Sequence, residues 1–141
     1  MSVPINYLAV IVAAFANMVL GALWYGPLFG EAWKTMMAFS PEKLAAMKAK
    51  GMAMSYGLMA IGSILMAWVL AHAIIFAGAF LEMGGLSTGL MAGFMNWLGF
   101  VVPVTVGAVL WEGRSWKLWW LNASYSLVGF LIMGAILSVW M

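Results

Sequence analysis

Hydrophobic and polar positions separate into long blocks along this chain. The six basic and four acidic residues fall within 31–50, at Glu82 or within 112–117. Between them lie four uncharged stretches: 1–30, 51–81, 83–111 and 118–141. Each stretch exceeds the roughly 20 residues that an apolar helix needs to cross the hydrocarbon layer of a bilayer. The pattern therefore predicts four membrane-spanning helices.

Turn signals and caps set the expected ends of these helices. Pro4 suits the first turn of the first helix, and Gly26-Pro27 ends it. Ser40-Pro41-Glu42 has the residue types of an N-cap and a first helical turn, so we expect a helix to start there and to run without a break into the second apolar stretch. The expected spans are 4–28, 51–76, 86–111 and 118–140, within a single domain that covers 1–141. The predicted fold class is all-α: an integral membrane four-helix bundle with short connections.

Composition narrows the class of protein further. The chain is 67% hydrophobic and 7% charged, whereas water-soluble domains carry about 25% charged residues, so a soluble globule is excluded. The absence of cysteine excludes disulfides and thiolate metal sites. A net charge of +2 is too small for a nucleic-acid interface, and the first residues lack the basic segment of a cleaved signal peptide. The expected partner is the lipid bilayer, and no nucleic acid is expected.

The distribution of basic residues predicts the orientation. All six Lys and Arg residues lie in the first and third connections. The positive-inside rule places those connections in the cytoplasm and both termini outside it. An aromatic belt is expected at the same boundary: Trp24, Tyr25, Trp33, Trp111, Trp116, Trp119 and Trp120. The expected location is the bacterial cytoplasmic (inner) membrane.

Polar side chains inside the expected spans are the candidate functional residues, because hydrocarbon cannot satisfy their hydrogen bonds. At about 1.5 Å of rise per residue, they form two layers. The layer nearer the cytoplasm comprises Asn17, Asn122, Tyr125 and Ser126, and the outer layer comprises His72 and Asn96. We expect Asn17 to hydrogen-bond the other members of its layer within one subunit. Such bonds can simply hold helices together, or the same residues can line a site for a solute.

Rows of small residues at four-residue spacing allow helices to approach closely. The first row is Ala13, Asn17 and Gly21; the second is Gly85, Gly89 and Gly93, continuing to Trp97; the third is Gly99, Pro103 and Gly107. We expect Pro103 to kink the third span. Spacing alone does not say whether the partner helix belongs to the same chain, so packing within one chain and a homo-oligomer both stay open.

The chemistry of several protein classes is missing from the expected spans. Ion-coupled transporters usually keep a carboxylate within a span, and none is present here. His72 is the single histidine, which excludes a bis-histidine haem, and the 14 methionines are interpreted as apolar filler. No metal, cofactor or catalytic residue is expected. Glu82 is the one carboxylate expected on the same side as His72, and this leaves a weak case for acid–base chemistry.

The third connection carries a separate candidate site. Arg114 and Lys117 follow Glu112 in a short turn between tryptophans, and their positive charges suit anionic lipid head groups. The alternative is a membrane anchor whose charges form a solvated ion pair.

Two motifs resemble a known family. The first is Asn17 followed by LWYGPLFGEAW over 23–33. The second is WEGR at 111–114 with LNASY at 121–125, MGAIL at 133–137 and Trp140. Together they are similar to the bacterial membrane family named domain of unknown function 1761. The resemblance implies a small four-span protein and brings no activity, substrate or catalytic residue.

The sequence leaves the biochemical role open among three classes. The first is a non-enzymatic packing or interaction protein. The second is a channel or facilitator for a small solute or lipid, lined by Asn17, Asn96, Asn122 and Tyr125. The third is a membrane enzyme that uses His72 and Glu82. A filled interior is typical of the first, a wet cavity joining the polar layers of the second, and an acid beside His72 of the third.

Overall fold

Helices make up every regular element of the protein in the computed structural model, which describes residues 2–141. Four helices are long and apolar enough to cross a membrane: Tyr7–Leu28, Ala53–Leu81, Leu86–Leu110 and Trp116–Val139. The predicted all-α fold class and its four apolar helices are therefore confirmed.

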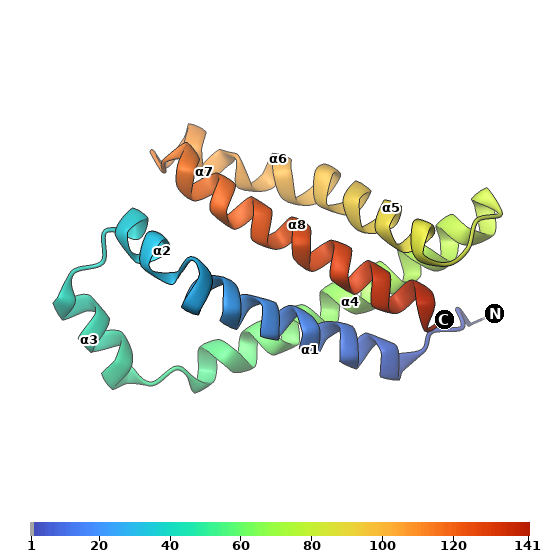
Figure 1. Cartoon of the computed structure of the whole chain (residues 1–141), viewed down its shortest axis with the longest axis horizontal. Coiled ribbons are helices and arrows are strands. Elements are labelled where there is room, and N and C mark those ends of the chain that lie inside the picture. Colours follow the sequence, from blue (N-terminus) through green and yellow to red (C-terminus); the bar gives the residue numbers. More distant parts are fainter. Residues whose placement is uncertain (1) are drawn as a thin grey trace.

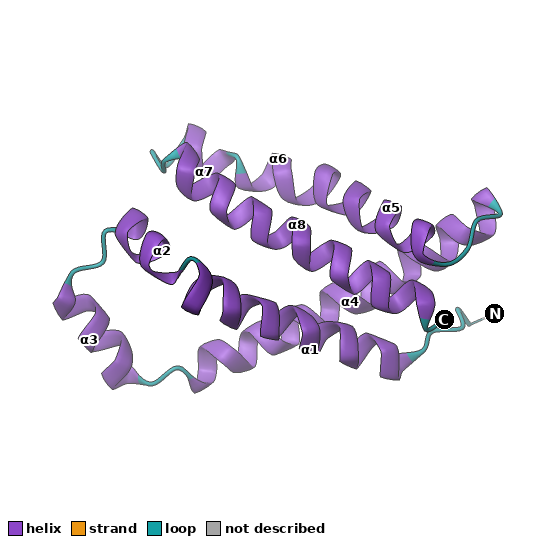
Figure 2. Cartoon of the chain, viewed as in Figure 1, coloured by secondary structure: helices purple, strands orange, loops and turns teal. Residues whose placement is uncertain are grey.

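Two of these helices are interrupted, and shorter helices lie between them. The first comprises α1 (Tyr7–Leu23) and the π-helical turn η1 (Trp24–Leu28), and α2 (Gly30–Met37) and α3 (Pro41–Lys50) follow. The second is α4 (Ala53–Leu81). The third consists of α5 (Leu86–Asn96), η2 (Trp97–Val101), α6 (Val102–Thr105) and α7 (Gly107–Leu110), and the fourth is α8 (Trp116–Val139). Figure 2 shows the loops that separate α2 from α3 and α3 from α4.

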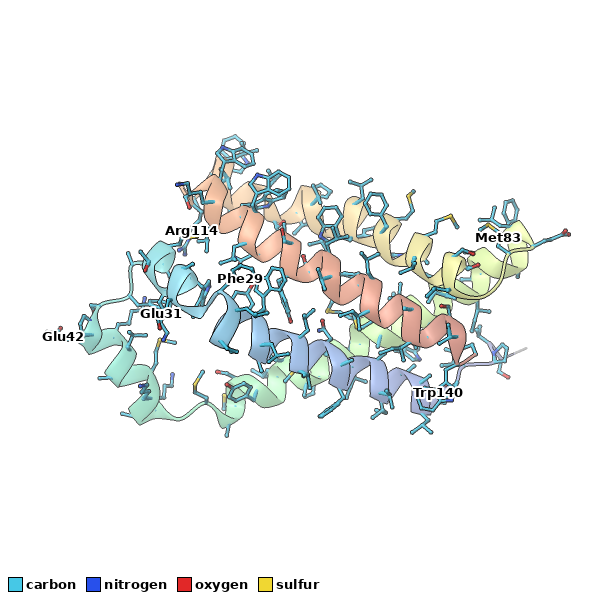
Figure 3. The ribbon with its side chains drawn as sticks, in the orientation of Figure 1. Phe29, Glu31, Glu42, Met83, Arg114 and Trp140 are labelled. Atoms are coloured by element: carbon cyan, nitrogen blue, oxygen red, sulfur yellow. The ribbon has the colours of Figure 1, made fainter. Side chains whose placement is uncertain are left out.

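Charged residues gather at one end of the molecule. The chain's two ends lie at the right of the view, whereas α2, α3 and α7 all lie towards the left (Figure 1). Figure 3 shows Glu31, Glu42 and Arg114 on the side of α2, α3 and α7, and Met83 and Trp140 on the side of the chain ends. We call the end that carries Glu31, Glu42 and Arg114 the charged end. The first and third connections therefore share one end, as four alternating helices require.

The connection into α4 differs from the predicted continuous helix. Ser40 caps α3 as expected, because its Oγ accepts a hydrogen bond from the Lys43 N–H at 3.1 Å. However, α3 ends at Lys50 and Gly51 adopts φ +79°, a conformation that glycine tolerates and that breaks the helix. At its other end α4 continues beyond the predicted limit at residue 76 and reaches Leu81, since no glycine pair or charge interrupts it before Glu82.

Polar side-chain caps also set the starts of α1 and α8. The first helix begins at Tyr7 and not at Pro4, because the Asn6 side chain accepts a hydrogen bond from the Ala9 N–H at 3.1 Å. Ser115 caps α8 in the same way, accepting from the Leu118 N–H at 3.1 Å. Each cap satisfies a backbone donor that the first turn of a helix leaves unpaired. The Asn6 amide also donates to the Trp140 carbonyl at 2.9 Å, which joins the two ends of the chain.

Two of the four long helices contain a proline, and each is interrupted by a π-helical turn. In η1 the Phe29 N–H bonds the Trp24 carbonyl at 2.8 Å, and Gly26 leaves the helical region with φ −110° and ψ −105°. Gly30 then starts α2; a Cβ there would lie 2.7 Å from the Tyr25 carbonyl oxygen, so the close approach requires glycine. In the third helix η2 ends just before Pro103. The third helix thus departs from regular α-helical geometry in the turn before Pro103, because proline removes an N–H and disturbs the preceding turn.

Glycines bring α5 and α8 together. The backbones of Gly89 and Gly134 touch, and a Cβ on Gly93 would lie 2.6 Å from the Phe130 carbonyl oxygen. The predicted role of this row as a packing surface is confirmed for Gly89 and Gly93. Gly85 has open space around it and does not take part, because it precedes the first turn of α5.

The remaining rows have contrasting surroundings. Ala13 is fully buried, and Gly21 faces the Tyr125 ring of α8, so the first row packs inside the chain. The row that starts at Gly99 has open space beside Gly99 and an exposed Pro103. Towards the chain ends the interior is filled by side chains with almost no exposed surface: Leu70, Met133 and Leu137.

Candidate site: a mostly apolar cavity at the charged end

A cavity of about 650 Å³ opens among the helices near the charged end. Tyr25 of η1 and Met37 of α2 line one side, and the turn with Glu112 and Arg114 lines another. The third helix and α8 supply the remaining walls: Val101, Val104, Thr105, Gly107, Ala108, Trp111, Leu118, Trp119, Asn122, Ala123, Tyr125 and Ser126. Most of this surface is apolar or aromatic, and the polar groups are few and specific in position.

Tyr25 connects the kinked end of the first helix to α8. Its hydroxyl donates a hydrogen bond of 2.7 Å to Asn122 Oδ1. Its ring packs edge-on against Tyr125 and Trp33, with centroid distances of 5.1 and 5.4 Å. The π-helical turn positions Tyr25 for these contacts, because an additional residue in the turn rotates the side chains that follow. Asn122 and Tyr125 therefore share one wall, and the belt residue Tyr25 joins them there.

The indole N–H groups of two tryptophans form hydrogen bonds between α8 and the third helix. The Trp119 Nε1–H donates to Thr105 Oγ1 at 3.1 Å, and the Thr105 hydroxyl donates to the Val101 carbonyl at 2.7 Å. The Trp97 Nε1–H donates to the Ala123 carbonyl at 3.0 Å and to Ser126 Oγ at 3.2 Å. Ser126 thus faces the third helix. These bonds satisfy polar groups in an apolar interior and hold the cavity walls in register.

Arg114 supplies a cation to the cavity. Within residues 2–141 one ion pair occurs at 4.0 Å or less, between Lys34 and Glu31. Arg114 therefore has no carboxylate partner in the described part of the chain, although Glu112 lines the same cavity. The hydrogen bond that its guanidinium makes is weak: Nη1 lies 3.9 Å from the Met37 sulfur. Lys117, the other head-group candidate, is exposed and does not line the cavity.

Asn17 lies deeper, between α1, α4 and α8. It is 4% exposed, and its Nδ2 donates to Ser63 Oγ on α4 at 2.9 Å. Its carbonyl oxygen faces Gly129 of α8. The hydrogen bond of Asn17 therefore joins α1 to α4, and not to Asn122 or Ser126 of its predicted layer. Ser63, its partner on α4, was not recognised in the sequence, because a single serine in an apolar stretch gives no signal of what it faces.

The two outer polar residues each bond their own helix. Asn96 Nδ2 donates to the Ala92 carbonyl at 2.8 Å, and Asn96 lines a smaller groove of about 430 Å³ beside Leu65 and Phe100. His72 Nδ1 donates to the Trp68 carbonyl at 2.8 Å, one turn earlier in α4. Neither side chain faces the charged-end cavity.

The arrangement of residues 2–141 supports neither acid–base chemistry at His72 nor a metal site. His72 and Glu82 lie ten residues apart on α4, which runs unbroken to Leu81, so about 15 Å separates them along the axis. The predicted hairpin therefore does not fold Glu82 back onto His72. No group of three or more His, Cys, Asp or Glu residues that could hold a metal occurs within 2–141.

Taken together, these features define the class: an all-α protein with four helices apolar enough to span a membrane and a mostly apolar cavity at its charged end. The chain belongs to the family described as protein of unknown function (DUF1761), whose model matches residues 8–138. The resemblance carried by the two sequence motifs is therefore confirmed. No curated protein and no solved structure matches the chain.

Proposed function

We propose that this is a non-enzymatic integral membrane protein that binds a lipid-like amphiphile in the charged-end cavity. The observation that carries the proposal is Arg114, a guanidinium without a carboxylate partner within 2–141, at the edge of a cavity with largely apolar and aromatic walls. Binding, rather than catalysis, is the role that this combination supports best.

The shape and chemistry of the cavity suit part of an amphiphile. Its volume of about 650 Å³ lies within the range of ligand sites, about 300–1,000 Å³. Val101, Val104 and Leu118 offer apolar surface to a chain, and Trp111 and Trp119 offer aromatic surface. The planar guanidinium of Arg114 matches the geometry of a phosphate group. The cavity thus suits a phosphate-bearing head group and the first part of its chains.

Membrane placement completes the proposal. All six basic residues occur in the connections at the charged end, and the positive-inside rule then favours a cytoplasmic position for that end in a bacterial inner membrane. Both termini would lie outside the cytoplasm. The ligand would come from the cytoplasmic leaflet. The exposed row with Gly99 and Pro103 leaves room for a homo-oligomer, which this proposal does not require.

A continuous pathway for a solute has less support. Of its four proposed lining residues, Asn122 and Tyr125 reach the cavity, whereas Asn17 is bonded to Ser63 and Asn96 lines a different groove. Buried side chains such as Met133 and Leu137 fill the interior towards the chain ends. These observations favour a cavity that is closed on that side.

The test compares two lipids that differ in the phosphate head group. Native mass spectrometry of the purified full-length protein would measure binding of phosphatidylglycerol and of diacylglycerol with the same acyl chains. We expect tighter binding of phosphatidylglycerol, and Arg114→Gln should weaken it about tenfold or more, because a hydrogen bond to a charged group contributes about 1.5–3 kcal/mol.

Two further variants serve as controls. Lys117→Gln removes the same charge outside the cavity and should leave the affinity nearly unchanged. Ala108→Phe should fill the cavity and reduce binding of both lipids, while the Arg114 backbone bond to the Ala108 carbonyl is preserved. Equal losses for Arg114→Gln and Lys117→Gln, or unaltered binding to Ala108→Phe, would refute the proposal.

A further inference from the structure

We infer that α3 is a membrane-surface helix whose lysines bind the head groups of anionic phospholipids. The helix stands apart from the bundle at the charged end (Figure 1). It forms no extended interface with another helix of residues 2–141, and all of its residues except Leu44 are exposed. A helix of ten residues is too short to be stable alone in water, so α3 requires a stabilising surface outside the described chain.

The residues of α3 are arranged for an interface between oil and water. Leu44 and Met47 are three positions apart and share one face of the helix. Lys43 and Lys50 border one edge of this face, and Lys48 borders the other, since it follows Leu44 by four positions. Lysines on both edges of an apolar stripe can extend their ammonium groups to lipid phosphates while their stems cover apolar surface.

The opposite face completes the amphipathic pattern. Glu42 lies away from the Leu44 and Met47 stripe, together with three small residues: Ala45, Ala46 and Ala49. The single carboxylate would thus point to water. With three lysines and one glutamate, the helix is complementary in charge to a surface of anionic lipids.

Neighbouring aromatic residues place α3 at the level of the membrane boundary. Lys43 Nζ lies 5.0 Å from the centroid of the Phe39 ring, and Phe39 packs edge-on against Trp33 at 5.4 Å. Trp33 in turn packs against Tyr25 at the cavity. Aromatic residues favour the interface between head groups and hydrocarbon. Gly51, with φ +79° and open space around it, then allows α3 to lie in the membrane plane while α4 enters the bilayer.

This inference rests on the membrane placement in the proposed function and is independent of the ligand in the cavity. Because the chain has no cysteine, a single cysteine can carry an environment-sensitive fluorophore. Met47→Cys labels the apolar stripe, and Ala46→Cys labels the opposite face. The full-length protein would be reconstituted in vesicles of phosphatidylcholine, with and without phosphatidylglycerol, and exposed to a water-soluble quencher.

We expect the label at position 47 to be shielded from the quencher when phosphatidylglycerol is present and more accessible when it is absent. The label at position 46 should stay accessible in both. Replacing Lys43, Lys48 and Lys50 by Gln, which keeps good helix propensity, should abolish the lipid dependence, whereas Lys117→Gln should preserve it. Equal accessibility of both labels, shielding that ignores the lipid, or shielding retained by the triple variant would overturn the inference.

Failure of this test can be distinguished from failure of the cavity proposal. Native mass spectrometry of the triple variant reports on the cavity directly. If phosphatidylglycerol binding there still depends on Arg114 while the label at position 47 shows no lipid dependence, the α3 inference alone is wrong.

Discussion

The Tyr25 hydroxyl donates a 2.7 Å hydrogen bond to Asn122 Oδ1 across 97 residues of chain. The bond joins the π-helical turn at the end of the first helix to α8, at the edge of the cavity. The two residues belong to the two motifs that the family resemblance rests on. Their contact gives a physical reason for both motifs: the Trp-Tyr-Gly-Pro turn directs Tyr25 towards α8, and α8 presents an acceptor at the matching height.

Removing the Tyr25 hydroxyl should measurably destabilise the protein. Tyr25→Phe keeps the ring contacts with Trp33 and Tyr125 but removes the donor, so we expect a loss of about 0.5–1.5 kcal/mol in unfolding free energy. Unfolding of the protein from mild detergent by a denaturing detergent would measure it. Asn122→Ala should cost a similar amount, and the double variant should cost less than the sum of the two; strict additivity would contradict the bond.

The Asn17–Ser63 pair is expected to show coupling in a double-mutant cycle. Asn17→Ala and Ser63→Ala each remove one side of a buried hydrogen bond between α1 and α4. We expect a coupling energy of about 0.6–2 kcal/mol, the range of hydrogen bonds between membrane helices. Asn96→Ala serves as the control paired with Ser63→Ala, because Asn96 bonds its own helix. A coupling of zero for Asn17 and Ser63 would show that the bond does not contribute.

Close packing of α5 on α8 should not tolerate even one methyl group. Gly89→Ala places a Cβ against the Gly134 backbone, and Gly93→Ala places one against the Phe130 carbonyl. Each is expected to lower stability by about 1–3 kcal/mol through overpacking. Gly62→Ala in α4 is the matched control, because a Cβ there meets nothing within 4 Å. Thermal unfolding in detergent compares the three, and equal midpoints would disprove this packing.

Cysteine labelling can test the orientation. Ser2→Cys and Met83→Cys lie at the end opposite to the charged residues, whereas Ala45→Cys lies on α3. A membrane-impermeant maleimide added to intact cells should label the first two and should reach position 45 only after the membrane is permeabilised. The reverse pattern would place the charged end outside and contradict the positive-inside assignment.

Sequence reasoning succeeded where the signal was local. The four apolar helices follow from long uncharged stretches, the Ser40 cap from one residue type before a proline, and the interruption of the third helix from Pro103. It failed where a second residue nearby favoured a different helix boundary. The unbroken helix expected from Ser40 into α4 was wrong because Gly51 ends α3, and the start at Pro4 was wrong because Asn6 provides a side-chain cap.

The site was predicted only in part. Asn122, Tyr125, Ser126 and Arg114 were singled out, and all four line the cavity. Thr105, Trp97 and Trp119 were not recognised as hydrogen-bonding partners of the walls, because a threonine or an indole in a membrane helix is compatible with lipid contact until its neighbour is known. Likewise, Asn17 within an apolar stretch indicated a buried polar group, but the sequence did not identify Ser63 as its hydrogen-bond partner.

What the sequence determined by itself is the apolar character of the four long helices, their number and where most of them begin and end. Those properties depend on the free energy of moving each segment from water to hydrocarbon and on caps within one turn. Both are set by residues that are close together in the sequence. Only the tertiary structure decided which helix faces meet, that Gly89 contacts Gly134, and that Tyr25, Asn122 and Arg114 surround one cavity. Those relationships depend on how the helices rotate and cross. The sequence does not determine this, because an apolar helix face can pack equally well against lipid or against another helix.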